Sequence, residues 1–279
     1  MPTITASDGT RLHVDEHGDP AGRPVVLVAG FRAATTSWKS QQRALARAGY
    51  RVIALDKRGH GASEVGPDGG HTMQRHGRDI RDLLETLDLA DVSLVGGSLG
   101  GNSIWALLAD ADPASRAATA RVRNILIVDQ TPKMLNDATW PHGFYGYDEQ
   151  NRDTYFATGI PDPGRVPARS KGVVRIARVL RALQPQKLPR QLTPAELELI
   201  GDHARRDWRD TIASASVPVR FVAGAESELW PATHAAASAA LNPLASSVVI
   251  PEDGHAANIE QPKAFNRVLL EWLARPAAE

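Results

Sequence analysis

The stretch VSLVGGSLGGNS, at residues 92–103, constrains the fold more than any other part of this sequence. An apolar run typical of a buried strand ends at a glycine pair, and a helical pattern begins just after Ser98. Gly96, Ser98 and Gly100 fit the pattern G-x-S-x-G, in which a sharp strand-to-helix turn exposes the serine hydroxyl above a sheet. Side chains at the two glycine positions would collide with neighbouring elements. We therefore interpret Ser98 as a candidate nucleophile, against the alternative of an unreactive glycine-rich turn.

Short apolar runs alternate with amphipathic stretches along most of the chain. The runs PVVLVAG, RVIALD, VSLVGG, VRNILIVD, VPVRFVAG and SSVVIP predict strands at 24–30, 51–56, 92–97, 122–129, 217–224 and 246–251. Amphipathic stretches between them predict helices, and this alternation is typical of an α/β fold with a mostly parallel central sheet and helices on both faces. Residues 133–212 contain helical segments and no evident strand. We therefore predict an α/β core at 1–132 and 213–279, interrupted by a helical cap at 133–212.

Composition excludes several classes of protein. The sequence has no cysteine, which rules out disulfides and a cysteine nucleophile. Its 32 basic and 32 acidic residues balance, which argues against nucleic-acid and membrane partners. Residues 1–20 lack a basic segment followed by an apolar run, so we expect no signal peptide and a cytoplasmic protein. Nothing has the spacing of a metal site, a phosphate-binding loop or a dinucleotide fingerprint, so we predict no metal, no cofactor and a small-molecule substrate as partner.

Four stretches together resemble the α/β-hydrolase superfamily over nearly the full chain. They are the G-x-S-x-G turn, VLVAGFRAATTSW, ALDKRGHGASE at 54–64, and PEDGHAANIEQPKAFNRVLLEWL near the end. VLVAGFRAATTSW resembles the family's oxyanion loop, and ALDKRGHGASE resembles its Asp-x-Arg-Gly-x-Gly-x-Ser turn. The stretch near the end resembles the terminal Gly-His loop and the last helix. This resemblance implies the α/β-hydrolase fold with an inserted cap.

The resemblance also implies roles for three further residues. His255, in EDGHAAN, would be the base that takes the proton of Ser98, because a serine hydroxyl is a weak nucleophile without one. The backbone N–H groups of Phe31 and Leu99 would stabilise the oxyanion of a tetrahedral intermediate. Ala29 replaces the histidine of the family's usual His-Gly oxyanion loop. That departure is mild, because the loop acts through its backbone.

The acid that should orient His255 is not where the family usually places it. Most members have an aspartate three residues after a glycine in the loop that VAGAESELWP forms here, and this chain has Ser227 at that position. Glu226 and Glu228 flank it, but neighbours in an extended loop point in different directions. Asp129 ends the strand expected beside the nucleophile strand, where haloalkane dehalogenases and certain lactone hydrolases carry their acid. We favour Asp129 and keep the glutamates, or no working acid, as alternatives.

A serine nucleophile favours acyl transfer over dehalogenase or epoxide-hydrolase chemistry, for which this family uses a carboxylate. We predict a cofactor-free serine hydrolase that cleaves a small or medium-sized apolar carboxylic ester or lactone through an acyl-enzyme. The alternatives are carbon–carbon bond hydrolysis or perhydrolysis by the same machinery, and a non-enzymatic ligand-binding protein. Aromatic residues in and near the predicted cap suit an apolar pocket, although core packing would also explain them. The candidate pocket residues are Trp38, Trp140, Phe144, Tyr145 and Trp230.

Overall fold

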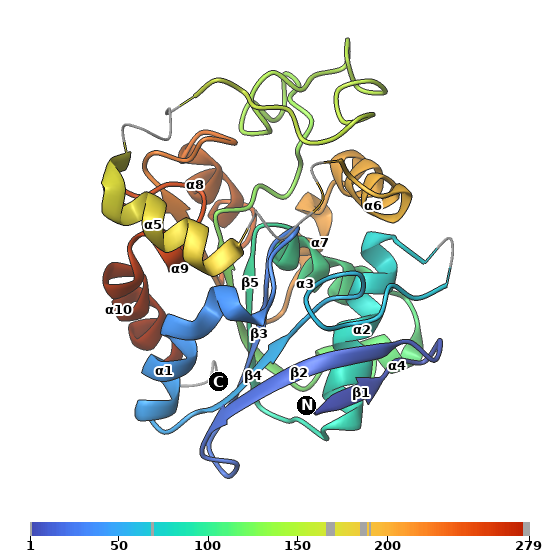
Figure 1. Cartoon of the computed structure of the whole chain (residues 1–279), viewed down its shortest axis with the longest axis vertical. Coiled ribbons are helices and arrows are strands. Elements are labelled where there is room, and N and C mark those ends of the chain that lie inside the picture. Colours follow the sequence, from blue (N-terminus) through green and yellow to red (C-terminus); the bar gives the residue numbers. More distant parts are fainter. Residues whose placement is uncertain (1, 68–69, 166–170, 185–188, 190, 276–279) are drawn as a thin grey trace.

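The nucleophile candidate follows a central strand of one eight-stranded sheet in the computed structural model (Figure 1). The structure describes residues 2–67, 70–165, 171–184, 189 and 191–275. The strands are β1 (Thr3–Thr5), β2 (Arg11–Gly18), β3 (Pro24–Val28), β4 (Arg51–Leu55), β5 (Val92–Gly97), β6 (Val122–Val128), β7 (Val219–Gly224) and β8 (Ala245–Ile250). Their order in the sheet is β1-β2-β4-β3-β5-β6-β7-β8.

The direction of the strands places the loops that matter for function. Strands β3 to β8 all pair in parallel, whereas β2 is antiparallel to both β1 and β4. All six strands predicted from apolar runs are present, and the prediction of a mostly parallel sheet is confirmed. Because parallel strands end at the same edge of a sheet, the loops after β3, β5, β6, β7 and β8 meet at one edge.

Helices cover both faces of the sheet, as the alternating sequence predicts. They are α1 (Lys39–Arg47), α2 (Met73–Thr86), α3 (Leu99–Ala109), α4 (Pro113–Thr119), α5 (Gly172–Leu183), α6 (Pro194–Arg205), α7 (Arg209–Ser214), α8 (Thr233–Ala239), α9 (Ala257–Glu260) and α10 (Pro262–Leu273), with a 3₁₀ turn η1 (Thr35–Trp38). Buried apolar side chains form two clusters, one on each face. Val26 and Val28 of β3 pack with α2 and α3, whereas Val25 and Leu27 pack with α1 and α10.

The long segment between β6 and β7 contains α5, α6 and α7, and the loops that follow β6 (green) lie at the top of Figure 1. Where the structure describes it, this segment has only isolated β-bridges and no strand. Helices in this segment agree with the sequence pattern. Two short helices elsewhere, α4 and α9, are not predicted by that pattern. The start of α4 does carry a local sign, because the Asp112 side chain caps the N–H of Ala114 and Pro113 opens the helix.

Candidate active site

Ser98 occupies a strained turn between β5 and α3. Its φ of +50° lies in the left-handed region, which residues other than glycine rarely adopt. A Cβ on Gly96 would lie 2.5 Å from the Cα of Gly101 in α3. One on Gly100 would lie 2.3 Å from the carbonyl oxygen of Val28 in β3. Close packing of the helix against the strands therefore requires both glycines, as the G-x-S-x-G pattern predicts.

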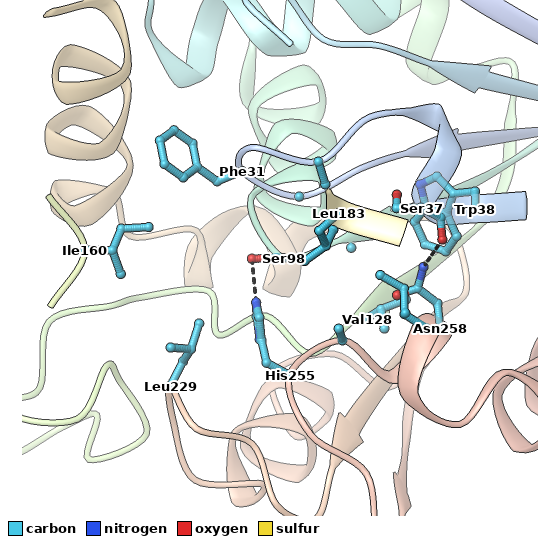
Figure 2. Close-up of a pocket in the computed structure, with 15 residues that line it drawn as sticks. Phe31, Ser37, Trp38, Ser98, Val128, Ile160, Leu183, Leu229, His255 and Asn258 are labelled. Carbon is cyan, nitrogen blue, oxygen red and sulfur yellow. Dashed lines mark hydrogen bonds between the residues drawn. The ribbon is translucent and has the colours of Figure 1, made fainter. Parts of the chain in front are cut away.

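Two hydrogen bonds connect Ser98, His255 and Asp129. The Nε2 atom of His255 lies 2.9 Å from Ser98 Oγ (Figure 2), and its Nδ1 atom lies 2.7 Å from Asp129 Oδ2. An ionised carboxylate only accepts hydrogen bonds, so Nδ1 carries the proton and donates it. Nε2 is then an acceptor, and the Ser98 hydroxyl donates to it. This arrangement can move the serine proton to the imidazole, which is what an activated serine nucleophile requires.

Asp129 is a fully buried carboxylate held by four donors. Its Oδ2 atom accepts from His255 and, at 2.6 Å, from the Ser227 hydroxyl. Its Oδ1 atom accepts from the backbone of Gly224 at 3.0 Å and from His234 Nε2 at 3.4 Å. Burial by itself raises the pKa of Asp129, but the hydrogen bonds from His234 and His255 outweigh it and hold that pKa below its ordinary value. The carboxylate therefore stays ionised and fixed in direction.

No sequence pattern predicts Ser227 or His234 as partners of the acid. Ser227 stands where the family usually carries its aspartate, and its hydroxyl now donates to the carboxylate on the neighbouring strand. Counting from Gly224 locates that position, so a polar contact there could have been inferred. His234 gives no such sign, because it lies in an ordinary helical stretch. Only the packing of α8 against β7 brings it to Asp129.

The two glutamates kept as alternative acids make other contacts. Glu228 accepts from the backbone N–H of His255 at 2.8 Å and forms an ion pair with Lys171. Glu226 pairs with Arg175 of α5 at 2.9 Å. Within the described residues, neither carboxylate is hydrogen-bonded to the imidazole ring. The glutamates thus join the loop after β7 to α5, and the geometry favours the carboxylate at the end of β6 as the acid.

The loop after β3 brings the backbone of Phe31 beside Ser98. A Cβ on Gly30, the preceding residue, would lie 3.0 Å from the Cβ of Ser98. Leu99 begins α3, so its N–H is one of the unsatisfied donors of a helix N-terminus. Neither N–H group has a hydrogen-bond partner among the residues that the structure describes. Two unpartnered donors next to the hydroxyl are what an oxyanion site needs.

A cavity of about 190 Å³ adjoins Ser98 (Figure 2). Trp38 forms part of its wall, and Ile160, in the segment between β6 and β7, also lines it. Another space, of about 30 Å³, also borders Ser98, and Phe144 and Trp230 line it. Most of the side chains around both spaces are apolar. Three of the five candidate pocket residues therefore lie where an apolar group bound at Ser98 would meet them.

The structure places the other two candidates elsewhere. Trp140 and Tyr145 line neither space beside Ser98. The buried indole of Trp140 donates to Thr131 Oγ1 at 3.0 Å. The guanidinium of Arg165 lies over the Tyr145 ring, 4.4 Å from its centroid. Both aromatic side chains therefore contact other protein groups and do not line the spaces at Ser98. Packing of this kind is the alternative that the sequence left open.

Asp253, two residues before His255, is a fully buried carboxyl group. Neither of its oxygens has a hydrogen-bond partner in the described part of the chain. Burial, reinforced by the nearby Glu260 carboxylate, raises the pKa of Asp253 from its ordinary 3.8 to about 8. Between pH 3.8 and about pH 8, Asp253 therefore keeps its proton in the folded protein, whereas it has lost it in the unfolded chain. The free energy of unfolding therefore falls as the pH rises through this range.

We expect Asp253→Asn to remove this pH dependence, because asparagine does not ionise. Relative to wild type, the free energy of unfolding of the variant should rise by up to about 1.4 kcal/mol for each pH unit over the range. Urea unfolding at about pH 4.5 and about pH 7.5 measures the difference. A difference of the same size at both pH values would mean that Asp253 is already ionised in the folded protein.

Neither a metal cluster nor a membrane span is found in the described residues. They contain no group of three or more histidine, cysteine, aspartate or glutamate side chains that could hold a metal ion. No helix among them is long and apolar enough to cross a bilayer. The predicted absence of a cofactor and the predicted choice of partner stay predictions.

Known proteins resemble this chain over most of its length. A family model described as "alpha/beta hydrolase fold" matches residues 23–262. The non-heme haloperoxidase of Rhodococcus erythropolis is 31% identical over 259 residues, covering 86% of each chain. The non-heme chloroperoxidase of Streptomyces lividans is 37% identical over 143 residues, which are 51% of this chain. This match spans about half (50%) of the length of that relative. Among solved structures, a thermophilic esterase from Thermogutta terrifontis has a TM-score of 0.73 at 25% identity, covering 98% of this chain and 97% of its own.

Proposed function

This chain belongs to the α/β-hydrolase fold family, and from that membership we propose that it is a serine hydrolase acting on small or medium-sized apolar carboxylic esters or lactones. One observation carries the proposal: hydrogen bonds run from Ser98 through His255 to Asp129 at the wall of a small, mainly apolar cavity. The esterase among the structural relatives supports ester cleavage in particular.

In the proposed reaction, Ser98 Oγ attacks the carbonyl carbon of the substrate while its proton passes to His255 Nε2. Asp129 keeps Nδ1 protonated and stabilises the imidazolium that forms. The N–H groups of Phe31 and Leu99 donate to the oxyanion of the tetrahedral intermediate. Collapse of that intermediate releases the alcohol, which takes the proton from His255, and leaves an acyl-enzyme. Water, deprotonated by His255, then attacks the acyl group, and the carboxylic acid and free serine are released.

We also propose that residues 133–212 act as a cap over this site. Ile160 and Leu183, both in this segment, line the cavity at Ser98 (Figure 2). Lys171 and Arg175 form ion pairs with glutamates of the core, which would hold this part of the cap in place. An apolar roof excludes water and leaves few partners for a polar acyl chain, so it favours apolar substrates.

The first test is Ser98-dependent hydrolysis of p-nitrophenyl acetate and butyrate. Wild-type protein should hydrolyse these esters and should be labelled by a fluorophosphonate on the peptide that contains Ser98. Ser98→Ala provides the unlabelled, inactive baseline, because the covalent intermediate cannot form without the hydroxyl. Mass spectrometry of the labelled peptide identifies the site. Folded wild-type protein that remains unlabelled would favour a ligand-binding protein without catalysis.

Perhydrolysis is another candidate, favoured by the two relatives that are named as haloperoxidases. Hydrogen peroxide would replace water in the deacylation step, so that the acyl group leaves as a peroxyacid and the serine hydroxyl is restored. Reaction of p-nitrophenyl acetate with the protein in the presence of hydrogen peroxide separates the two chemistries. A Ser98-dependent excess of peracetic acid favours perhydrolysis, whereas acetic acid alone favours hydrolysis.

A further inference from the structure

Lys57 is a buried lysine next to the loop that follows β3. It lies in the DKRGHG turn after β4, and only 2% of its surface is exposed. Its Nζ atom donates to the carbonyl oxygen of Gly30 at 2.8 Å. Removing an amino group from water costs free energy unless it is well bonded. The proposed reaction includes no step that uses Lys57, although its burial costs free energy.

The bond to Gly30 determines the direction of a neighbouring N–H group. The carbonyl of Gly30 and the N–H of Phe31 belong to one peptide group, and no described peptide bond is cis. In a trans peptide these two groups point in opposite directions. Whatever fixes the carbonyl therefore also aims the N–H. The N–H of Ala33 donates to the same oxygen at 3.2 Å from within the loop, so among the described residues Lys57 is the contact that ties this carbonyl to another element.

The residue before Lys57 holds the far end of the same loop. The Oδ1 atom of Asp56 accepts from the backbone N–H of Thr35 at 2.6 Å, and its Oδ2 atom accepts from that of Ala62 at 2.9 Å. Two consecutive residues at the end of β4 thus fasten both ends of the loop. A rigid strand end is a better support than a loop alone, because catalytic donors must be held within a fraction of an ångström.

From this geometry we propose that Lys57 is a positioning residue that aims the Phe31 N–H at the oxyanion through the carbonyl of Gly30. This role rests on the proposed function and deepens it, since Lys57 itself does not touch the substrate. Burial lowers the pKa of Lys57 to about 7, and the neighbouring Asp56 carboxylate opposes that shift. Both the ammonium and the amine carry N–H groups, so the bond to Gly30 persists in either form.

Two substitutions at Lys57 test this role. Lys57→Met preserves most of the side-chain volume and Lys57→Leu is a shorter apolar replacement, and both remove the donor. The variant whose thermal midpoint lies nearer to that of wild type is taken forward. Its kcat/KM for p-nitrophenyl acetate and its affinity for phenylboronic acid should both fall about tenfold, less than the loss from deleting an oxyanion donor. The boronic acid reports on the oxyanion site because it forms a tetrahedral adduct with Ser98.

A substrate-binding measurement separates positioning from general damage. In a Ser98→Ala background, adding the Lys57 substitution should leave the Kd of the ester unchanged, because the ground state does not use the oxyanion site fully. A folded Lys57 variant that binds the boronic acid as tightly as wild type overturns the role. An equal loss of ester affinity, or failure of both variants to fold, overturns it as well, by making Lys57 structural. Wild-type protein without Ser98-dependent boronate binding would refute the proposed function itself.

Discussion

Replacing Asp129 with asparagine is expected to lower kcat/KM for p-nitrophenyl acetate by about 10⁴, because the base is left in the wrong tautomer. All four acceptor positions of the Asp129 carboxylate are occupied by donors, His255 among them. An asparagine amide has two N–H donors and only one acceptor oxygen. Its amino group would therefore face donors on one side of the site. His255 could then no longer be held with its proton on Nδ1.

A double variant, Glu226→Gln with Glu228→Gln, is the matched control. Both glutamates are partly exposed and pair with Lys171 and Arg175, and glutamine keeps an amide oxygen that can still accept the bond that Glu228 receives from the His255 backbone N–H. We expect kcat/KM of this variant to remain within about tenfold of wild type, since the imidazole keeps its carboxylate partner. Circular dichroism of each variant shows whether it is folded. If the double variant lost its activity while Asp129→Asn remained active, the acid would instead be one of the glutamates in the loop after β7.

Replacing Gly100 with alanine is expected to lower kcat/KM by about 10² or more, because a displacement of about 1 Å at a catalytic group has that cost. The added Cβ would lie 2.3 Å from the carbonyl oxygen of Val28 and 2.6 Å from that of Ala29. Both contacts are with backbone, which cannot rotate away. Helix α3 must then shift from β3, and the shift moves Ser98 and the N–H of Leu99 together. We also expect a loss of about 1–3 kcal/mol in the free energy of unfolding from overpacking.

Gly97→Ala, three residues earlier, supplies the comparison. A Cβ there would meet only the Trp38 ring, at 3.3 and 3.6 Å, and a side chain can give way where backbone cannot. This variant should keep its thermal midpoint within a few degrees of wild type and kcat/KM for the acetyl ester within about tenfold. The comparison is kcat/KM for p-nitrophenyl acetate of Gly100→Ala and Gly97→Ala, measured under the same conditions. Equal activity in the two would mean that the close packing at Gly100 does not control the position of Ser98.

Local patterns in the sequence carry the sheet and the nucleophile turn. Buried parallel strands need continuous apolar runs, and each such run became a strand close to its predicted ends. The turn at Ser98 can be predicted from the sequence because a side chain at Gly96 or Gly100 would collide with the backbone of an adjacent element. Glycine is therefore needed at a fixed distance on either side of the serine. His255 and the oxyanion positions came from resemblance to a family, because no periodicity or local spacing marks them. They meet Ser98 because the loops after parallel strands share one edge of the sheet.

Only the tertiary structure distinguishes the candidate acids by their distances and shows where the candidate aromatic residues lie. Asp129 and Glu228 are both carboxylates in plausible loops, and the distance to the imidazole separates them. Trp140 lies away from the cavity, and its buried indole N–H donates to Thr131 Oγ1. Such contacts join residues far apart in the chain and depend on the direction of each side chain. The spacing of residues in the sequence determines the local conformation of a strand, helix or turn. It does not determine which side chains from distant parts of the chain face each other across a site.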